Sequence, residues 1–476
     1  PSLIGQKSRE QTLLTYYLPP EPVLGAEGVI TAIEDDGKTG RLWLAGIPGN
    51  VLDYYGTNSV LILADRPPSN TETVPAPDGE ASLAPFSLQL LSRTGLTAKV
   101  KVSGKGETSE KLQVGQCVQE WVRVLPRQVN LLVALDGNLE RIERVDATSA
   151  FSGIAQIRSV PAGEQPADCL LGRINPPAPP SSESPTPTAE ISPPAPVPPS
   201  DGPLPQPLNR YALFSVGHSL IPNTKGPSGE AVKVAIQRLV PSLRSLQATK
   251  LLRLTVNENS SRLAVGAVLE VVAPEPQQVM QRSTLRGTGT LLETSPPNGK
   301  PLRETGVVSL PIGSRIRYRL QNNSDHPVYF VLLGLDTSGS AIALYSGQAA
   351  NSATSPDTRP TLKQEEIAAG ETLTVPQISS AFEWVVREPA GIAETLILFS
   401  TLPFTQTLST LESGLRQISN SQRIGVPSNP VEVAQAVLID LHQASSGLPL
   451  TPTVAADFLA LHMNAWATLS FVYQVV

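Results

Sequence analysis

The stretch that decides the fold is residues 313–345, GSRIRYRLQNNSDHPVYFVLLGLDTSGSAIALY. Apolar residues and arginines alternate along RIRYRL at residues 315–320, which is typical of a strand with one buried and one polar face. The turn formers NNSDHP lead into VYFVLLGL at residues 328–335, an apolar run that predicts a strand buried on both faces. DTSG then turns the chain again before a third strand. The stretch therefore predicts an antiparallel sheet.

The same texture continues toward the C-terminus. Further strands are predicted at residues 371–375, 382–386 and 394–402. We therefore expect an antiparallel β-sandwich over residues 301–410.

The last segment, residues 411–476, combines helices with a final strand. Asn429 and Pro430 are start signals for one helix, and Pro452 predicts a second, short one. Residues 466–476 then alternate as a strand with large apolar groups on both faces. We expect this strand to be buried and to pair with a sheet edge of the same chain.

A smaller β domain is predicted at residues 27–126. Short strands recur there between turn clusters, among them the hairpin signal DDGK at residues 35–38. This spacing favours a small barrel or sandwich. Residues 1–26 hold several turn formers and little periodicity, which is typical of a connector from a preceding domain.

A mixed α/β domain is predicted for residues 127–175 together with residues 208–300. Its first part has the pattern of a β-α-β unit. Leu139, Ile142 and Val145 repeat there at helical spacing as the apolar side of a helix. Its polar side carries charges of both signs, for which we expect a surface network: Glu140, Arg141, Glu143, Arg144 and Asp146.

A proline-rich tract, residues 176–207, separates the two parts of this domain. It contains 14 prolines in 32 residues. Because proline lacks an N–H donor and fixes φ, we interpret the tract as an extended linker or an insertion. Beyond it we expect a helix that Pro241 breaks or kinks, and a strand at residues 262–272.

Composition agrees with a multidomain α+β chain of mostly antiparallel β structure. Hydrophobic residues make up 40% of its 476 residues, which is enough to build several cores. The net charge of −6 argues against a nucleic-acid-binding protein, which is normally basic. No apolar run is long enough for a transmembrane segment.

Individual side chains predict no catalytic, cofactor-binding or metal site. Cys117 and Cys169 fit buried core positions, as free cysteines commonly do. His326 lies in a turn before proline and is expected to be solvated. His442 and His462 are expected on helices, in packing or at the surface, and no pair of histidines has metal-ligand spacing.

Two clusters of charged residues, one of arginines and one of aspartates, could in principle bind an ion. Arg315, Arg317 and Arg319 share one strand face, where an anion site is the alternative to a salt-bridged outer face. We expect the salt-bridged face, because the alternation requires polar side chains there. Asp35 and Asp36 belong to a turn and have too few oxygen ligands nearby for calcium.

Five long stretches resemble the region that follows the caspase-like domain in cyanobacterial proteins of the orthocaspase or metacaspase type. They are LQVGQCVQEWVRVL (112–125), LVALDGNLERIERVDATSAF (132–151), GEAVKVAIQRLV (229–240), the opening stretch (313–345) and NAWATLSFVYQVV (464–476). Residues 313–404 resemble the domain of unknown function often appended to such peptidases, and PSLIGQKSREQ (1–11) resembles the exit from the small caspase subunit.

The resemblance does not extend to the catalytic residues. Peptidase activity in that family needs a histidine, usually followed by glycine, and a downstream cysteine nucleophile. Here none of His218, His326, His442 and His462 precedes glycine, and all four follow Cys169. We therefore transfer no catalytic residue to this chain.

The resulting expectation is a non-catalytic accessory region that regulates, scaffolds or targets a caspase-like cysteine peptidase homologue. The alternative is a stand-alone β-rich module that binds a peptide, a protein or a carbohydrate. The expected partner is the upstream caspase-like domain or another protein, without nucleic acid and without a cofactor. The resemblance implies a bacterial protein, either cytoplasmic or exported.

Overall fold

The structure is a computed structural model. It describes residues 25–64, 87–103, 112–174, 210–287, 307–335, 342–345, 364–377, 383–414, 424–425 and 427–476. Most of the connector, the proline-rich tract 176–207 and the turn at 336–339 lie outside these residues. The described residues form two compact units, the first within 1–128 and 248–476 and the second within 129–247. Several mostly antiparallel sheets and few helices confirm the α+β class.

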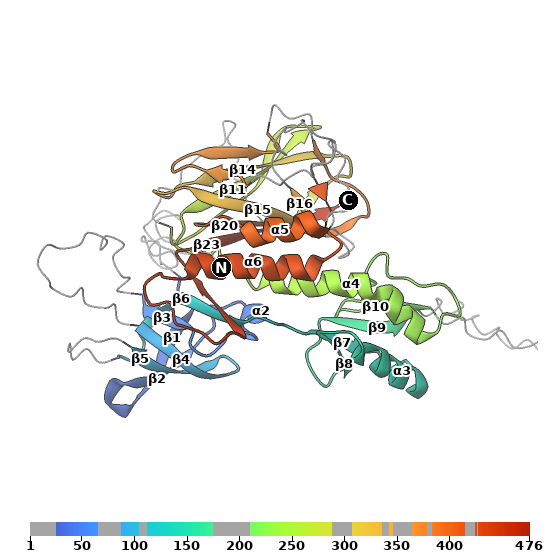
Figure 1. Cartoon of the computed structure of the whole chain (residues 1–476), viewed down its shortest axis with the longest axis horizontal. Coiled ribbons are helices and arrows are strands. Elements are labelled where there is room, and N and C mark those ends of the chain that lie inside the picture. The colour runs from blue at the N-terminus through green and yellow to red at the C-terminus, as the bar shows by residue number, and fades with distance from the viewer. Residues whose placement is uncertain are drawn as a thin grey trace, which may run out of the picture. The chain divides into compact units, whose positions relative to one another are not determined.

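Six antiparallel strands of the first unit close a barrel (Figure 1). Their order is β1 (Gly28–Glu34), β2 (Thr39–Trp43), β5 (Thr97–Ser103), β4 (Ser87–Thr94), β3 (Val60–Leu63) and β6 (Cys117–Pro126). β1 pairs again with β6, where Gly28 lies opposite Val118. A Cβ on Gly28 would lie 2.7 Å from the Trp43 carbonyl oxygen on β2 and 3.3 Å from Val118 Cγ2 on β6, so glycine permits the close approach of β1 to both strands. The 3-10 helix η1 (Asp35–Gly37) and the short helix α2 (Gly49–Leu52) connect strands of the barrel.

Two further sheets of the first unit form the β-sandwich. One has the order β12 (Gln277–Ser283), β11 (Val265–Ala273), β14 (Arg315–Asn322) and β18 (Thr372–Val375), with β19 (Trp384–Val385) also on β14. The other has the order β13 (Val308–Leu310), β23 (Trp466–Val475), β20 (Gly391–Ser400), β15 (Val328–Leu335), β16 (Ile342–Tyr345) and β21 (Ile424–Gly425), with β17 (Glu366–Ile367) on β15. The sandwich thus includes strands on both sides of residues 301–410, and the strand expected at 262–272 is its β11.

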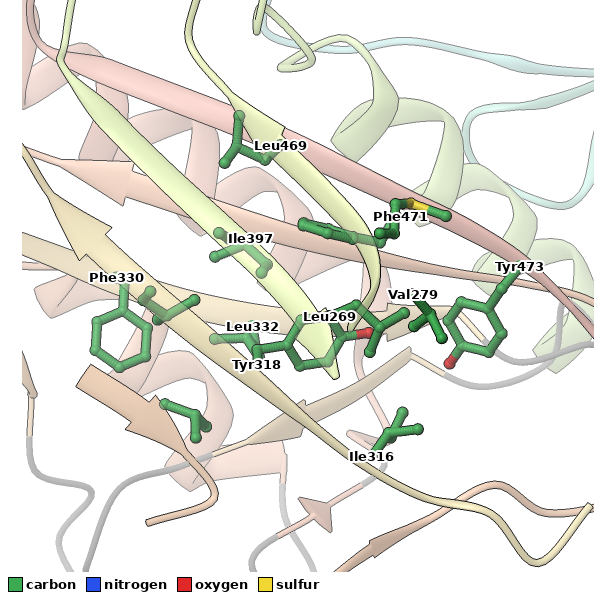
Figure 2. Packing of buried hydrophobic residues seen from close by; sticks show 14 of the residues in the cluster. Leu269, Val279, Ile316, Tyr318, Phe330, Leu332, Ile397, Leu469, Phe471 and Tyr473 are labelled. Atoms are coloured by element: carbon green, nitrogen blue, oxygen red, sulfur yellow. The ribbon is translucent and has the colours of Figure 1, made fainter. Parts of the chain in front are cut away.

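The sandwich core lies between these two sheets (Figure 2). Tyr318 of β14 contacts Phe471 of β23 edge to face, with ring centroids 5.4 Å apart. The Tyr318 hydroxyl also donates to Thr395 on β20 at 2.7 Å. Alternating residues of β14 therefore fill the core while its arginines face outward.

The C-terminal strand β23 lies inside the sandwich and not at an edge. It pairs with β20 over ten residue pairs, from Gly391 opposite Val475 to Ser400 opposite Trp466. Its other side pairs with β13, in parallel. Trp466 and Phe471 are both fully buried, so the strand is buried on both faces as the sequence predicted.

Two helices and one more strand belong to the C-terminal segment: α5 (Thr405–Gly414), α6 (Pro430–Ser445) and β22 (Phe458–His462). A short helix was expected from Pro452, but the chain forms β22 there, which pairs with the second half of β6. The helix prediction was wrong because a proline signal in the sequence does not reveal the strand pairing that β6 offers to this segment.

The second unit is a mixed sheet with helices. Its order is β10 (Tyr211–Phe214), β9 (Cys169–Arg173), β7 (Leu131–Leu135) and β8 (Ile157–Pro161), accompanied by α3 (Arg141–Ser152) and the first part of α4 (Val232–Arg253). β7 and β8 are parallel and α3 connects them, as the β-α-β pattern predicted. β9 and β10, the strands on either side of the proline-rich tract, pair with each other. α4 continues through Pro241, so the expected break is absent.

Candidate functional site

Helix α3 buries a different face from the one that its apolar periodicity predicted. Its buried residues are Glu143, Ala147 and Phe151. Ile142 and Val145, which belong to the predicted apolar side, are 74% and 62% exposed. The helix therefore presents an apolar face to solvent.

A polar network explains why Glu143 takes the buried side. Arg173 Nε donates to its carboxylate at 2.9 Å, and the Tyr211 hydroxyl donates to the same oxygen. Glu143 also accepts the N–H of Glu140 at 2.7 Å, which completes a capping box. Burial raises the pKa of Glu143, but the hydrogen bonds from Tyr211 and Arg173 outweigh it and keep that pKa below its usual value. The ionised carboxylate therefore fixes the rotation of α3.

A groove with a volume of about 680 Å³ lies beside the exposed face of α3. Two neighbouring parallel strands contribute their carboxyl ends to it, with Leu135 from β7 and Pro161 from β8. The lining residues are Leu135, Gly137, Arg144, Val145, Thr148, Ser149, Ser152, Pro161 and Ala162. The carboxyl ends of parallel strands are where ligands bind in open α/β sheets.

The groove offers few polar groups to a ligand. The Thr148 hydroxyl donates to the Arg144 carbonyl at 2.9 Å, and the Ser152 hydroxyl donates to the Ser149 carbonyl at 2.7 Å. Both hydroxyls thus bond to their own helix. Arg144 is the single charged side chain in the lining. The site can therefore bury an apolar group beside a cation, and its lining includes no histidine, cysteine or carboxylate.

A second polar cluster lies in the first unit and joins the barrel to the sandwich. Arg123 of β6 donates to Glu120 from Nε at 2.8 Å and from Nη2 at 2.7 Å, and both side chains are 0% exposed. Nη1 of Arg123 donates to the carbonyls of Leu254 and Val256 at 2.8 and 3.0 Å. Every nitrogen of this guanidinium is therefore occupied within the chain.

Glu27 extends this cluster. It accepts Nη1 of Arg286 at 2.9 Å, the Ser260 hydroxyl at 2.9 Å and the N–H of Glu120 at 2.6 Å. Burial raises the pKa of Glu27 although Arg286 opposes the shift. Because its polar groups bind one another, we interpret the cluster as one that stabilises the fold and not as a ligand site.

The cysteines and histidines do not converge on a site. Cys169 is buried in the core of the second unit, as expected. Cys117 is exposed at the start of β6, so the expectation that it is buried was wrong. His442 is on α6 as predicted, but His462 lies in strand β22 and is fully buried. His326 bonds to the adjacent Asp325 at 2.7 Å.

The arginines of β14 form the salt-bridged face that the alternation predicted. Arg315 pairs with Glu383 at 2.9 Å. Arg317 and Arg319 share Glu270, at 2.6 and 3.2 Å. All three guanidinium groups are thus paired within the sandwich, with two carboxylates between them.

The described residues contain neither a cluster of metal ligands nor a membrane-spanning helix. No group of three or more histidine, cysteine or acidic residues among them could hold a metal ion. Within the same residues, no helix is long and apolar enough to span a membrane.

One comparison with known proteins gave a match. A family model for a domain of unknown function (DUF4384) matches residues 309–403. The matched stretch contains β14 to β20, while β11, β12 and β23 lie outside it. No curated protein and no solved structure matched the chain.

Proposed function

We propose that this chain is a non-catalytic accessory region of a caspase-like cysteine peptidase homologue, and that it binds a polypeptide of that protein in the groove beside α3. One observation carries the proposal: the exposed Val145 lines a groove at the carboxyl ends of two parallel strands, and the exposed Ile142 lies three residues before it on the same helix. Exposed apolar groups that adjoin a concavity are typical of protein-binding surfaces.

The composition of the groove favours a polypeptide over a carbohydrate. None of the lining residues is aromatic, and the hydroxyls of Thr148 and Ser152 are engaged by the helix backbone. A sugar would meet no stacking surface, and few hydrogen-bonding groups apart from the Arg144 guanidinium. An apolar side chain would instead be buried against Leu135, Val145 and Pro161, and each such side chain contributes about 1.5–3 kcal/mol when fully buried.

The resemblance of the sequence is what supports a caspase-like domain as the partner. Residues 132–151, which include α3, are among the stretches that resemble the region following a caspase-like domain. The competing proposal, a stand-alone module, predicts that the groove binds peptides but not such a domain.

Calorimetric titration of the purified chain with the separately produced caspase-like domain of the parent protein tests the proposal. We expect saturable binding that Val145→Asp weakens at least about tenfold, because the change places a charge in the apolar contact. Val234→Asp is the matched control, since Val234 is an exposed valine on α4 that does not line the groove. Absence of binding, or equal weakening by both variants, would refute the proposal.

A further inference from the structure

Arg144 is the charged residue of α3 that lines the groove, and its guanidinium has no partner among the residues that the structure describes. The neighbouring carboxylates are occupied: Glu140 and Glu143 pair with Arg173, and Asp146 pairs with Lys233 at 3.1 Å. Within the part of the chain that the structure describes, the Arg144 guanidinium forms no ion pair or hydrogen bond.

The position of Arg144 in the groove means that a bound segment would have to compensate its charge. It lines the groove together with apolar groups of Leu135, Val145, Pro161 and Ala162. A segment that fills the groove would remove water from the guanidinium, and an unpaired desolvated cation is unfavourable. A carboxylate on that segment would restore the lost hydrogen bonds, because it matches the planar guanidinium fork.

We infer that the segment bound in this groove carries an aspartate or glutamate side chain beside a bulky apolar side chain, and that its carboxylate pairs with Arg144. The inference rests on the proposed function and specifies the chemistry of the partner. The apolar side chain packs against Val145 and Leu135, and the carboxylate determines which segments are accepted. Neutral or basic segments are disfavoured because they leave Arg144 desolvated and unpaired.

The chain offers matched variants for a test. Arg144→Gln removes the charge and keeps a long side chain with good helix propensity. Arg141→Gln is the control, because Arg141 is an exposed arginine of the same helix that does not line the groove and forms no ion pair among the described residues. Circular dichroism and the unfolding temperature establish that both variants are folded.

The probes are fluorescein-labelled peptides copied from those surface segments of the caspase-like domain in which an aspartate or glutamate adjoins a large apolar residue. Fluorescence anisotropy gives the Kd of each peptide, and the tightest is remade with asparagine or glutamine in place of its acid. We expect Arg144→Gln and the acid-to-amide change each to weaken binding about tenfold. Together they should weaken it little further, whereas Arg141→Gln should change Kd less than twofold.

The outcomes separate this inference from the proposed function. If Val145→Asp weakens binding and Arg144→Gln does not, the carboxylate inference is overturned while the groove remains the binding site. Equal effects of Arg144→Gln and Arg141→Gln would also overturn it, since general electrostatic attraction would then suffice. If neither Val145→Asp nor Arg144→Gln has an effect, the proposed function fails as well.

Discussion

Replacing Arg123 with methionine should be among the most damaging single substitutions in the first unit. The side chain is fully buried and donates to both oxygens of Glu120 and to two backbone carbonyls. These carbonyls belong to the segment between α4 and β11, so the substitution removes a connection between barrel and sandwich. Methionine fills similar volume but satisfies none of these acceptors.

The expected loss of stability follows from the groups left behind. Removing one member of a buried ion pair costs about 3–5 kcal/mol, because the other charge remains buried without compensation. The carbonyls of Leu254 and Val256 lose their donor as well, at about 1–3 kcal/mol for each acceptor that water cannot reach. The sum is at least about 5 kcal/mol, comparable with the whole stability of an ordinary domain.

Urea unfolding followed by tryptophan fluorescence is a suitable assay, because the Trp466 ring centroid lies 5.5 Å from the Arg123 guanidinium carbon. We expect Arg123→Met to lower the midpoint strongly or to abolish the cooperative transition. Arg315→Met is the control: its ion pair with Glu383 is half exposed and should contribute at most about 1 kcal/mol. The double variant Glu120→Leu/Arg123→Met should be more stable than Arg123→Met alone, since it removes the uncompensated charge. A double variant that is less stable than the single one would refute this reasoning.

Three further predictions concern stability. Burial lowers the pKa of His462 to about 4, from 6.5 in the unfolded chain. Because the folded state disfavours the protonated imidazole, this residue's contribution to the free energy of unfolding is fully present above pH 6.5. That contribution declines by about 3 kcal/mol as the pH falls toward 4. His462→Gln should flatten this decline in pH-dependent unfolding midpoints, whereas the exposed control His218→Gln should leave it unchanged. Asp440→Ala should lower the free energy of unfolding by about 1–2 kcal/mol and speed amide exchange at the start of α5. The reason is that Asp440 accepts the N–H groups of Gln406 and Thr407 at 3.1 and 2.8 Å. Unchanged exchange there would contradict this role. Phe471→Ala in β23 should lower the free energy of unfolding by about 3–5 kcal/mol, because Phe471 lies in the sandwich core. Gln474→Ala, at an exposed position of the same strand, should lower it by less than about 0.5 kcal/mol. Similar losses for the two variants would show that β23 does not pack as described.

The strands of the sandwich could be predicted because local pattern and tertiary environment agree. The alternation along β14 indicates one buried face, and the apolar run of β15 indicates burial of both faces. The association of β11 and β23 with these strands could not be predicted in the same way. Both pair with strands distant in sequence, and alternation does not specify a partner.

The candidate site shows where sequence periodicity gives the wrong answer. Leu139, Ile142 and Val145 have helical spacing, but Glu143 is buried because Arg173 compensates its charge and Tyr211 donates a hydrogen bond to it. Arg173 and Tyr211 lie on β9 and β10, so no local pattern reveals them. One signal was present: Leu139, Glu143, Ala147 and Phe151 recur every four residues and mark the buried stripe once the glutamate is accepted as a member.

The groove itself was not predicted, because its lining comes from three elements. Leu135 and Pro161 are ordinary ends of apolar strands in the sequence, and Arg144 resembles any surface arginine of a helix. Only the parallel pairing of β7 with β8 brings the two strand ends beside α3.

Hydrogen–deuterium exchange of the whole chain, with and without a saturating amount of the proposed partner, a caspase-like domain, tests the central claim most directly. The groove account predicts slower exchange in peptides that cover residues 135–152 and 157–163, and unchanged exchange in β14 and in the barrel strands. Slower exchange confined to β14 or the barrel, or none at saturation, would contradict it.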